Sequence, residues 1–279
     1  MIDVHVHLPT KEVYRDSYGR FGEAIHRYFG SEFVEKTVEE MLGEFDETGV
    51  EKLVILGWDA ETTTGLPKVP NDYIAKIVET HPDRLIGFAS VDPHKGHIAV
   101  KELDRAIRDL GLKGLKLHQI AQAFYPNDHR FYPIFEKAVE LEIPVLFHMG
   151  MAAWGAGLPG GGGAKLKYSQ PIYIDDLAAD FPELKILAAH PGWPWHEELL
   201  AIALHKPNVY FDLSGYAPKY IPANVLHYAN TLLSEKCMFG SDYPYISPKR
   251  WLEEFKQLNF KSESREKILE KNAKIFLGV

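Results

Sequence analysis

The chain has 279 residues, of which 46% are hydrophobic and 25% charged, and its formal net charge is −8. This is the composition of a globular protein, long enough for one barrel-sized domain or two smaller ones. An acidic balance without a cluster of Lys and Arg argues against a nucleic-acid partner, and no apolar run reaches the ~20 residues of a membrane span.

The first predicted strand, residues 2–8, carries two histidines in an apolar, β-branched run. Because side chains alternate along a strand, His5 and His7 point to the same face. Two imidazoles side by side form half of a metal site. Two buried neutral histidines held by hydrogen bonds would give the same pattern, so this stretch alone leaves both interpretations open.

The chain then alternates strands and helices, after a Tyr- and Phe-rich insertion at 9–33. A capping box of Thr37 and Glu40 predicts the start of the first helix. Further strands are expected at 52–58, 85–91, 114–118, 144–148, 184–190, 208–214 and 236–242. The intervening and closing helices are expected at 37–47, 71–80, 97–110, 131–141, 172–180, 197–205, 219–234, 248–258 and 263–276.

Eight apolar strands separated by crossover helices pair in parallel and are buried on both faces. The pattern therefore predicts an α/β protein with one (β/α)₈ TIM-barrel domain spanning 1–279, with a doubly wound open sheet as the alternative. No linker of Pro, Ser or Gly divides the chain.

Polar side chains gather where the predicted strands end. In a barrel of this kind, the active site lies at the C-terminal ends of the strands. Those ends carry His5, His7, Lys116, His118, His148, His190, Asp212 and Asp242. Convergence of so many ligand-type side chains at one end predicts a metal site there.

Four segments resemble one known family. They are Val-His-Val-His7, Gly-Leu-Lys-Gly-Leu-Lys-Leu-His118, Ala-His-Pro-Gly192 and Phe-Gly-Ser-Asp-Tyr-Pro244. Their order resembles the amidohydrolase superfamily, in particular its amidohydrolase-related branch. That branch includes metal-dependent TIM-barrel hydrolases, the aminocarboxymuconate-semialdehyde and resorcylate decarboxylases, and a hydratase. The resemblance covers nearly the whole chain, but it does not choose among these reactions.

The resemblance implies the roles of the polar residues. His5, His7, His148 and Asp242 would bind one divalent metal ion, His190 would be the acid–base residue, and Asp242 would share in catalysis. Three neutral imidazoles and one carboxylate suit Zn²⁺, with Mn²⁺ and Fe²⁺ as alternatives. Some superfamily members carboxylate a lysine at the strand position of Lys116 to bridge two metals; here a polar role is favoured.

Other residues are expected to contact the substrate or to support the site. Aromatic rings near the strand ends favour a flat or aromatic substrate, although the tryptophans could simply pack the barrel rim. The lysines near the glycine-rich loop favour an anionic group on that substrate. The expected substrate contacts are Lys116, His118, Trp154, Trp193 and Tyr243. Asp92 and Asp212 are expected to fix imidazole tautomers, and the glycine-rich stretch within 151–170 is expected to be a mobile loop.

The sequence thus predicts a metal-dependent hydrolase acting on a small acyl, lactone or β-keto acyl compound. The alternatives are a metal-dependent decarboxylase or hydratase of an aromatic-degradation acid, and a non-catalytic metal-binding barrel. We expect a cytoplasmic protein with a small-molecule substrate and neither a nucleic-acid nor a membrane partner; homo-oligomer formation stays open. The single cysteine, Cys237, allows no intramolecular disulfide and is expected to be a buried apolar residue.

Overall fold

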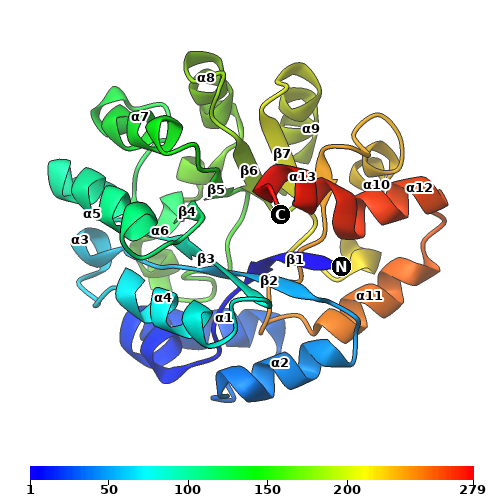
Figure 1. Ribbon diagram of the computed structural model, residues 1–279, viewed down its shortest axis with the longest axis horizontal. Coiled ribbons are helices and arrows are strands. Elements are labelled where there is room, and N and C mark those ends of the chain that lie inside the picture. The colour runs from blue at the N-terminus through cyan, green and yellow to red at the C-terminus, as the bar shows by residue number, and fades with distance from the viewer.

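The computed structural model describes residues 1–279 and contains one eight-stranded parallel sheet in the order β1 to β8 (Figure 1). The strands are β1 (Ile2–Val6), β2 (Lys52–Leu56), β3 (Leu85–Ala89), β4 (Gly114–Leu117), β5 (Val145–His148), β6 (Ile186–Ala189), β7 (Val209–Asp212) and β8 (Cys237–Met238). Backbone hydrogen bonds from Val4 N–H to the Phe239 carbonyl (3.0 Å) and from Asp242 N–H to the His5 carbonyl (3.0 Å) join the first strand to the last. The predicted (β/α)₈ barrel is confirmed.

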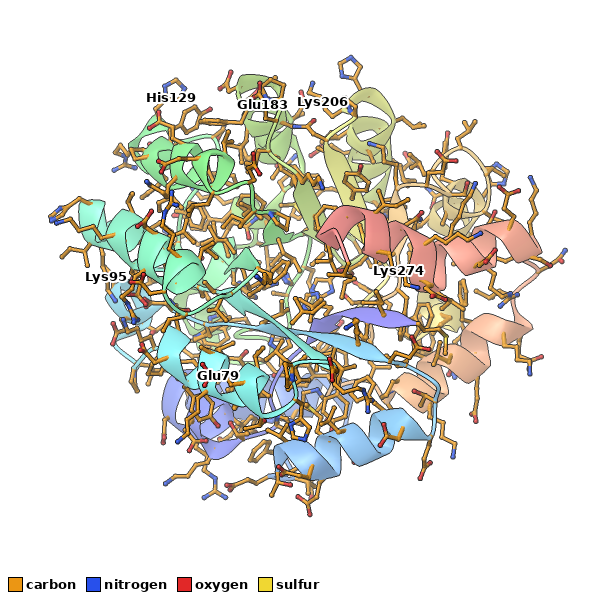
Figure 2. All side chains as sticks on the ribbon, in the orientation of Figure 1. Glu79, Lys95, His129, Glu183, Lys206 and Lys274 are labelled. Carbon is orange, nitrogen blue, oxygen red and sulfur yellow. The ribbon has the colours of Figure 1, made fainter.

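Helices surround the strands, as Figure 1 shows, and their outer faces carry charged side chains such as Glu79 and Lys274 (Figure 2). The longer ones are α1 (Arg20–Phe29), α2 (Val38–Asp46), α4 (Asn71–Thr80), α5 (His97–Arg108), α7 (Tyr132–Glu140), α8 (Ile172–Asp180), α9 (His196–His205), α10 (Ala223–Ala229) and α11 (Pro248–Gln257). The shorter ones are α3 (Glu61–Thr64), α6 (Gln119–Gln122), α12 (Ser262–Glu266) and α13 (Asn272–Leu277). The predicted capping box of α2 is present, because Thr37 and Glu40 each accept the other's backbone N–H. None of the helices is both long and apolar enough to cross a membrane.

The apolar side chains form two separate clusters. The larger one, of 64 buried residues, packs the strands against the helices. The smaller one, of 12 buried residues, combines side chains from six strands with Ala273 and Phe276 of α13. Strands around the whole barrel can share one small cluster only if these side chains point inward, so α13 closes one end of the barrel interior.

An irregularity in β1 brings its histidines into the barrel. Val4 belongs to the interior cluster and Val6 to the outer cluster, and the pairing of β1 with β2 shifts register between Asp3 and Val6. A bulge of this kind resets which side chains face inward. His5 and His7 therefore share the inner face, as predicted from strand alternation.

The insertion at 9–33 is more regular than its sequence indicates. It forms a π-helical segment at Glu12–Tyr18, followed by α1. Tyr18, Ile25 and Phe29 of this insertion line the cavity above the strand ends. The stretch without a clear helical period is thus part of the roof of the candidate site.

Candidate metal centre

A cavity that opens to solvent lies at the C-terminal ends of the strands. Its lining includes His5, His7, Lys116, His118, His148, Trp154, His190 and Asp242. Two other predicted contacts lie elsewhere: Trp193 is 47% exposed outside the cavity, and the Tyr243 hydroxyl faces Lys36, 3.5 Å from its Nζ. The structure therefore brings together most, but not all, of the residues singled out from the sequence.

Three donor atoms converge where the first and last strands meet. The Nε2 atoms of His5 and His7 lie 3.4 Å and 3.3 Å from Oδ1 of Asp242. All three side chains are buried, and one ligand atom from each lies within 4.8 Å of the others. This clustering of two imidazoles and a carboxylate is a suitable start for a divalent metal site.

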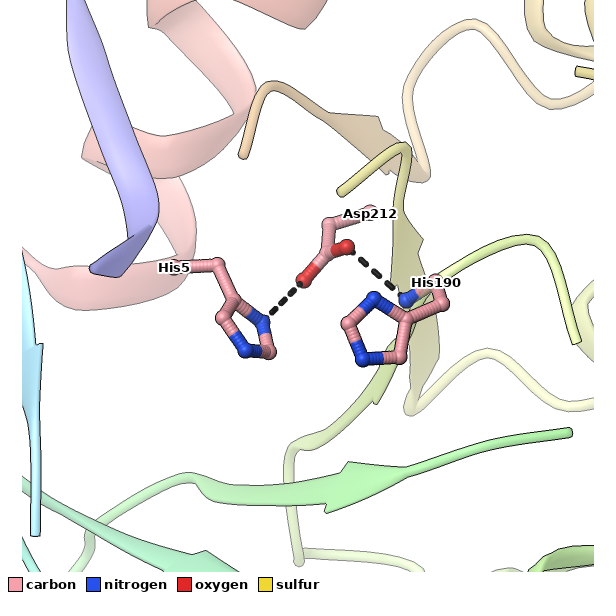
Figure 3. A group of neighbouring side chains, drawn as sticks. All are labelled: His5, His190 and Asp212. Atoms are coloured by element: carbon pink, nitrogen blue, oxygen red, sulfur yellow. Dashed lines mark hydrogen bonds and ion pairs between the residues drawn. The ribbon is translucent and has the colours of Figure 1, made fainter. Parts of the chain in front are cut away.

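One buried carboxylate, Asp212 at the end of β7, determines the proton positions on His5. Its Oδ2 lies 3.3 Å from Nδ1 of His5, and its Oδ1 accepts the backbone N–H of His190 at 2.9 Å (Figure 3). A carboxylate in this position keeps the proton of His5 on Nδ1. The lone pair of His5 Nε2 then faces Asp242, as a metal ligand requires. The prediction that Asp212 fixes an imidazole tautomer is confirmed.

A second branch of hydrogen bonds leads from Asp212 to His148. The Ser214 hydroxyl donates to Asp212, Nδ1 of His190 pairs with the Ser214 Oγ at 2.8 Å, and Nε2 of His190 pairs with Nδ1 of His148 at 3.0 Å. Because the Ser214 proton is used on Asp212, His190 donates from Nδ1 and accepts at Nε2. The proton of His148 is then on Nδ1, and its Nε2 carries the lone pair.

Nε2 of His148 is buried and has no hydrogen-bond partner. A buried polar atom without a partner is costly, and a metal ion in the cavity would satisfy it. Together with the lone pair of His5 directed at a carboxylate, this atom shows that the donor set fits a cation. We call His5, His7, His148 and Asp242 the metal wall of the cavity.

His5, His190 and Asp212 also lie close enough together to resemble a metal-binding group. The oxygens of Asp212, however, already accept N–H or O–H groups from His5, His190 and Ser214. This cluster is therefore a hydrogen-bond network behind the metal wall. Ser214 was not singled out from the sequence, because a lone Ser after a strand carries no distinctive signal.

The ionisation states suit metal binding. Burial is the main reason that the pKa values of His5 and His148 lie well below the usual range, so both rings are neutral. Burial raises the pKa of Asp242, but the hydrogen bond to His7 and the neighbouring imidazoles outweigh it, and the net pKa lies below the usual range. Asp242 is therefore a carboxylate.

Two of the residues at the strand ends have an uncommon backbone conformation. His190 has φ of +71° and Asp242 has φ of +65°, in the left-handed region that non-glycine residues seldom adopt. Such conformations cost free energy and are found where the surrounding structure fixes a side chain for function. Ala123 and Glu142 also have positive φ, but of the four only His190 and Asp242 line the cavity, and these two are the residues that the sequence predicts to be catalytic.

A family model described as Amidohydrolase matches residues 2–279. The chain belongs to the amidohydrolase family. A curated relative, the 2-amino-3-carboxymuconate-6-semialdehyde decarboxylase of Dictyostelium discoideum, is 26% identical over 240 residues, which are 75% of this chain and 65% of that enzyme. The resemblance inferred from the four motifs is confirmed.

Solved structures share this fold. An uncharacterised TIM-barrel protein of Bordetella bronchiseptica is 27% identical, with a TM-score of 0.85 over 100% of this chain and 98% of its own. A dihydroxybenzoic acid decarboxylase of Polaromonas sp. JS666, solved with manganese and 2-nitroresorcinol, is 19% identical. Its TM-score is 0.74 over 99% of this chain and 96% of its own, which supports the shared fold.

Aromatic rings form the upper walls of this amidohydrolase's cavity. Trp154 stacks on Phe21 with ring centroids 4.2 Å apart, and its ring also contacts Tyr18 and Trp58. Tyr18 hydrogen-bonds to Nδ1 of His7 at 3.1 Å, so the roof is joined to the metal wall. Tyr18 was missed because the sequence of the insertion shows only weak periodicity.

Two remaining expectations concern loops of the amidohydrolase fold. Asp92 accepts the backbone N–H groups of Thr62 and His94, not an imidazole, so its predicted role is wrong: it caps a turn. The glycine-rich segment Pro159–Gly163 is mostly exposed, and Gly160 to Gly162 have φ near +60°. A Cβ on Gly162 would lie 2.7 Å from the ring of Phe21. The mobility of this loop stays a prediction.

Proposed function

We propose that this amidohydrolase catalyses the metal-dependent, non-oxidative decarboxylation of a small planar carboxylic acid. The observation that carries the proposal is a cavity with aromatic walls directly above the metal wall, which would hold a flat acid with one edge against the donor atoms. The Dictyostelium and Polaromonas relatives are decarboxylases by name, which favours this reaction over the hydrolysis expected from the sequence.

The metal wall would hold one divalent cation through His5, His7, His148 and Asp242. Such a cation would polarise an oxygen of the substrate and neutralise charge that develops on it. Zn²⁺ fits three imidazoles and a carboxylate. Mn²⁺ accepts the same ligands and is the ion bound in the Polaromonas structure, so we propose Mn²⁺ and Zn²⁺ as the first ions to test.

The protein's own residues would orient the acid and supply a proton. In decarboxylation the bond to the carboxylate carbon breaks, its electron pair stays on the substrate carbon, CO₂ leaves, and the substrate carbon takes a proton. His190 lines the cavity, is not needed as a ligand, and connects through Ser214 to Asp212. We assign proton delivery to His190: its Nε2, which accepts a hydrogen bond from Nδ1 of His148 in the protein alone, would take up a proton from solvent and pass it to the substrate carbon.

The test is CO₂ release from a panel of hydroxylated benzoates and unsaturated dicarboxylic acids. The Mn²⁺-loaded and Zn²⁺-loaded enzymes should release CO₂ from at least one acid, and metal-stripped enzyme should release none. A parallel panel of lactones and acyl esters measures hydrolysis. If the enzyme hydrolyses a compound of that second panel and releases CO₂ from none of the acids, the decarboxylase proposal is wrong and the hydrolase function expected from the sequence is favoured.

A further inference from the structure

A buried ammonium group in the catalytic cavity has no anionic partner. Lys116 on β4 is 1% exposed and lines the cavity. Its Nζ makes no hydrogen bond. No carboxylate oxygen lies within 4.0 Å of it, the limit for an ion pair, although other lysines and arginines in the protein, such as Lys274 with Glu270, form such pairs. A buried charge is costly unless it is paired, so Lys116 is an unsatisfied cation directed at the substrate's space.

A second donor lies beside Lys116. His118 follows it by two residues and faces the same side of the strand. Nδ1 of His118 accepts the backbone N–H of Ala121 at 3.3 Å, so the proton of this ring is on Nε2, which has no partner in the protein. The ring is held by stacking on His148 at 4.2 Å. Lys116 and His118 therefore present an ammonium and a neutral N–H from one surface, which we call the β4 wall.

The β4 wall differs in charge from the metal wall, although the two adjoin where His118 stacks on His148. Lys116 is the only Lys or Arg among the 19 residues that line the cavity, and Asp242 is the only carboxylate among them. In the strand order of the barrel, β4 is four strands from β8, so the two groups project from opposite sides. One side of the cavity thus suits a cation and the other suits an anion.

We propose that Lys116 and His118 form a subsite for a second acid group of the substrate, which is retained in the product. The substrate would be a planar acid with two anionic groups, one at the metal wall and one at the β4 wall. This inference rests on the proposed function only in taking the group at the metal wall to be the carboxylate that is lost. Recognition of the acid group at the β4 wall is argued from Lys116 and His118 themselves. A planar ring between the aromatic walls would span the two sides.

The experiment compares the binding of acids that lack the hydroxyl groups needed for turnover. Benzoate, isophthalate and terephthalate are titrated calorimetrically into the Mn²⁺-loaded enzyme. At least one dicarboxylate should bind about 10- to 100-fold more tightly than benzoate, as expected for a charge-assisted hydrogen bond. In Lys116→Met this advantage should vanish while the affinity for benzoate stays unchanged. Lys113→Met is the matched control, because Lys113 is exposed at the other end of β4.

The proposal is overturned if benzoate and both dicarboxylates bind the wild-type enzyme equally well. It is also overturned if Lys116→Met weakens benzoate as much as the dicarboxylates, because Lys116 would then hold the only carboxylate. Should Lys116→Met fail to fold, His118→Phe keeps the stacking on His148 and should reduce the dicarboxylate advantage severalfold; an unchanged advantage there would overturn the proposal. Binding is measured without turnover, so a failure of decarboxylation leaves this result readable on its own.

Discussion

The two walls of the cavity differ in the groups that they present. The metal wall presents imidazole lone pairs and a carboxylate, whereas the β4 wall presents an ammonium and a neutral N–H. A direct ion pair between Lys116 and Asp242 would satisfy both, but these groups do not meet. Lys116 and Asp242 stand on strands that lie four apart in the barrel, so their opposite charges remain apart and available for a ligand.

The separation depends on the strands. β1, β5 and β8 supply the metal wall and β4 supplies the other, and each side chain stands on or at the end of a strand packed in the barrel. A rigid scaffold holds such groups in place at little further cost in entropy when a ligand binds. Changing one wall at a time should therefore reveal what each contributes.

The largest effect is expected from the metal wall. His148→Ala removes a ligand whose Nε2 has no other partner, so bound metal and activity should be lost together. Metal content by mass spectrometry, measured beside turnover, checks this. His129→Ala, at an exposed histidine, is the control and should retain one metal per chain. If His148→Ala keeps its metal, His148 does not belong to the metal wall.

A smaller effect is expected from the residue behind the metal wall. His190→Ala leaves all four donors in place, so metal should stay bound, weakened by about 10- to 100-fold because His148 loses its hydrogen bond. Turnover at saturating metal should fall about 10²- to 10⁴-fold, as for loss of a general acid–base group. The turnover of Ser214→Ala should lie between those of His190→Ala and the wild type. Complete loss of metal in His190→Ala would make His190 a ligand instead.

The β4 wall predicts an effect on stability with a defined pH dependence. Burial lowers the pKa of Lys116 from 10.5 to about 8, although Asp212 and Asp242 oppose this. Between these pH values the unfolded chain binds more protons than the folded protein, so stability rises with pH. Below pH 8, Lys116 is protonated in both the folded and the unfolded state, and the buried ammonium then lowers the stability of the folded protein by its full amount.

Urea titrations of metal-free protein measure this effect. Between pH 7 and pH 10.5, the free energy of unfolding of the wild type should rise by about 3 kcal/mol relative to that of Lys116→Met, since each unit of pKa shift is worth 1.36 kcal/mol. Lys113→Met should show no such change relative to wild type. If the free energies of unfolding of wild type and Lys116→Met change with pH in parallel, the folded protein already stabilises the ammonium. The β4 wall would then not differ from the metal wall in the way described.

The sequence predicts the barrel well because each strand carries its own local signal. An apolar run such as Leu184-Lys-Ile-Leu-Ala-Ala-His190, followed by a helix, needs no knowledge of distant residues. The side chains at the strand ends follow from the fold, so most of the cavity lining could be predicted. Strand lengths were less accurate: β8 contains only Cys237–Met238, because the chain leaves the regular ladder before Asp242.

What the sequence could not predict depends on contacts between distant segments. The roles of Ser214 and Tyr18 exist only because β7 and the insertion meet the metal wall in space. Trp193 and Tyr243 were expected to contact substrate because they follow strand ends, but the direction of a loop side chain depends on local turns. Tyr243 packs toward Phe45, with ring centroids 5.2 Å apart.

The junction of β1 with the end of β8 has a consequence for how the protein is made. His5 and His7 are synthesised long before Asp242, because they lie on or next to the first strand of the barrel and Asp242 follows the last. A nascent chain therefore holds an incomplete donor set throughout elongation, and the early part of the barrel must stay protected without help from a bound ion. A metal ion would bind tightly only after β8 has joined β1, and its binding would then stabilise the closed barrel of the newly made protein.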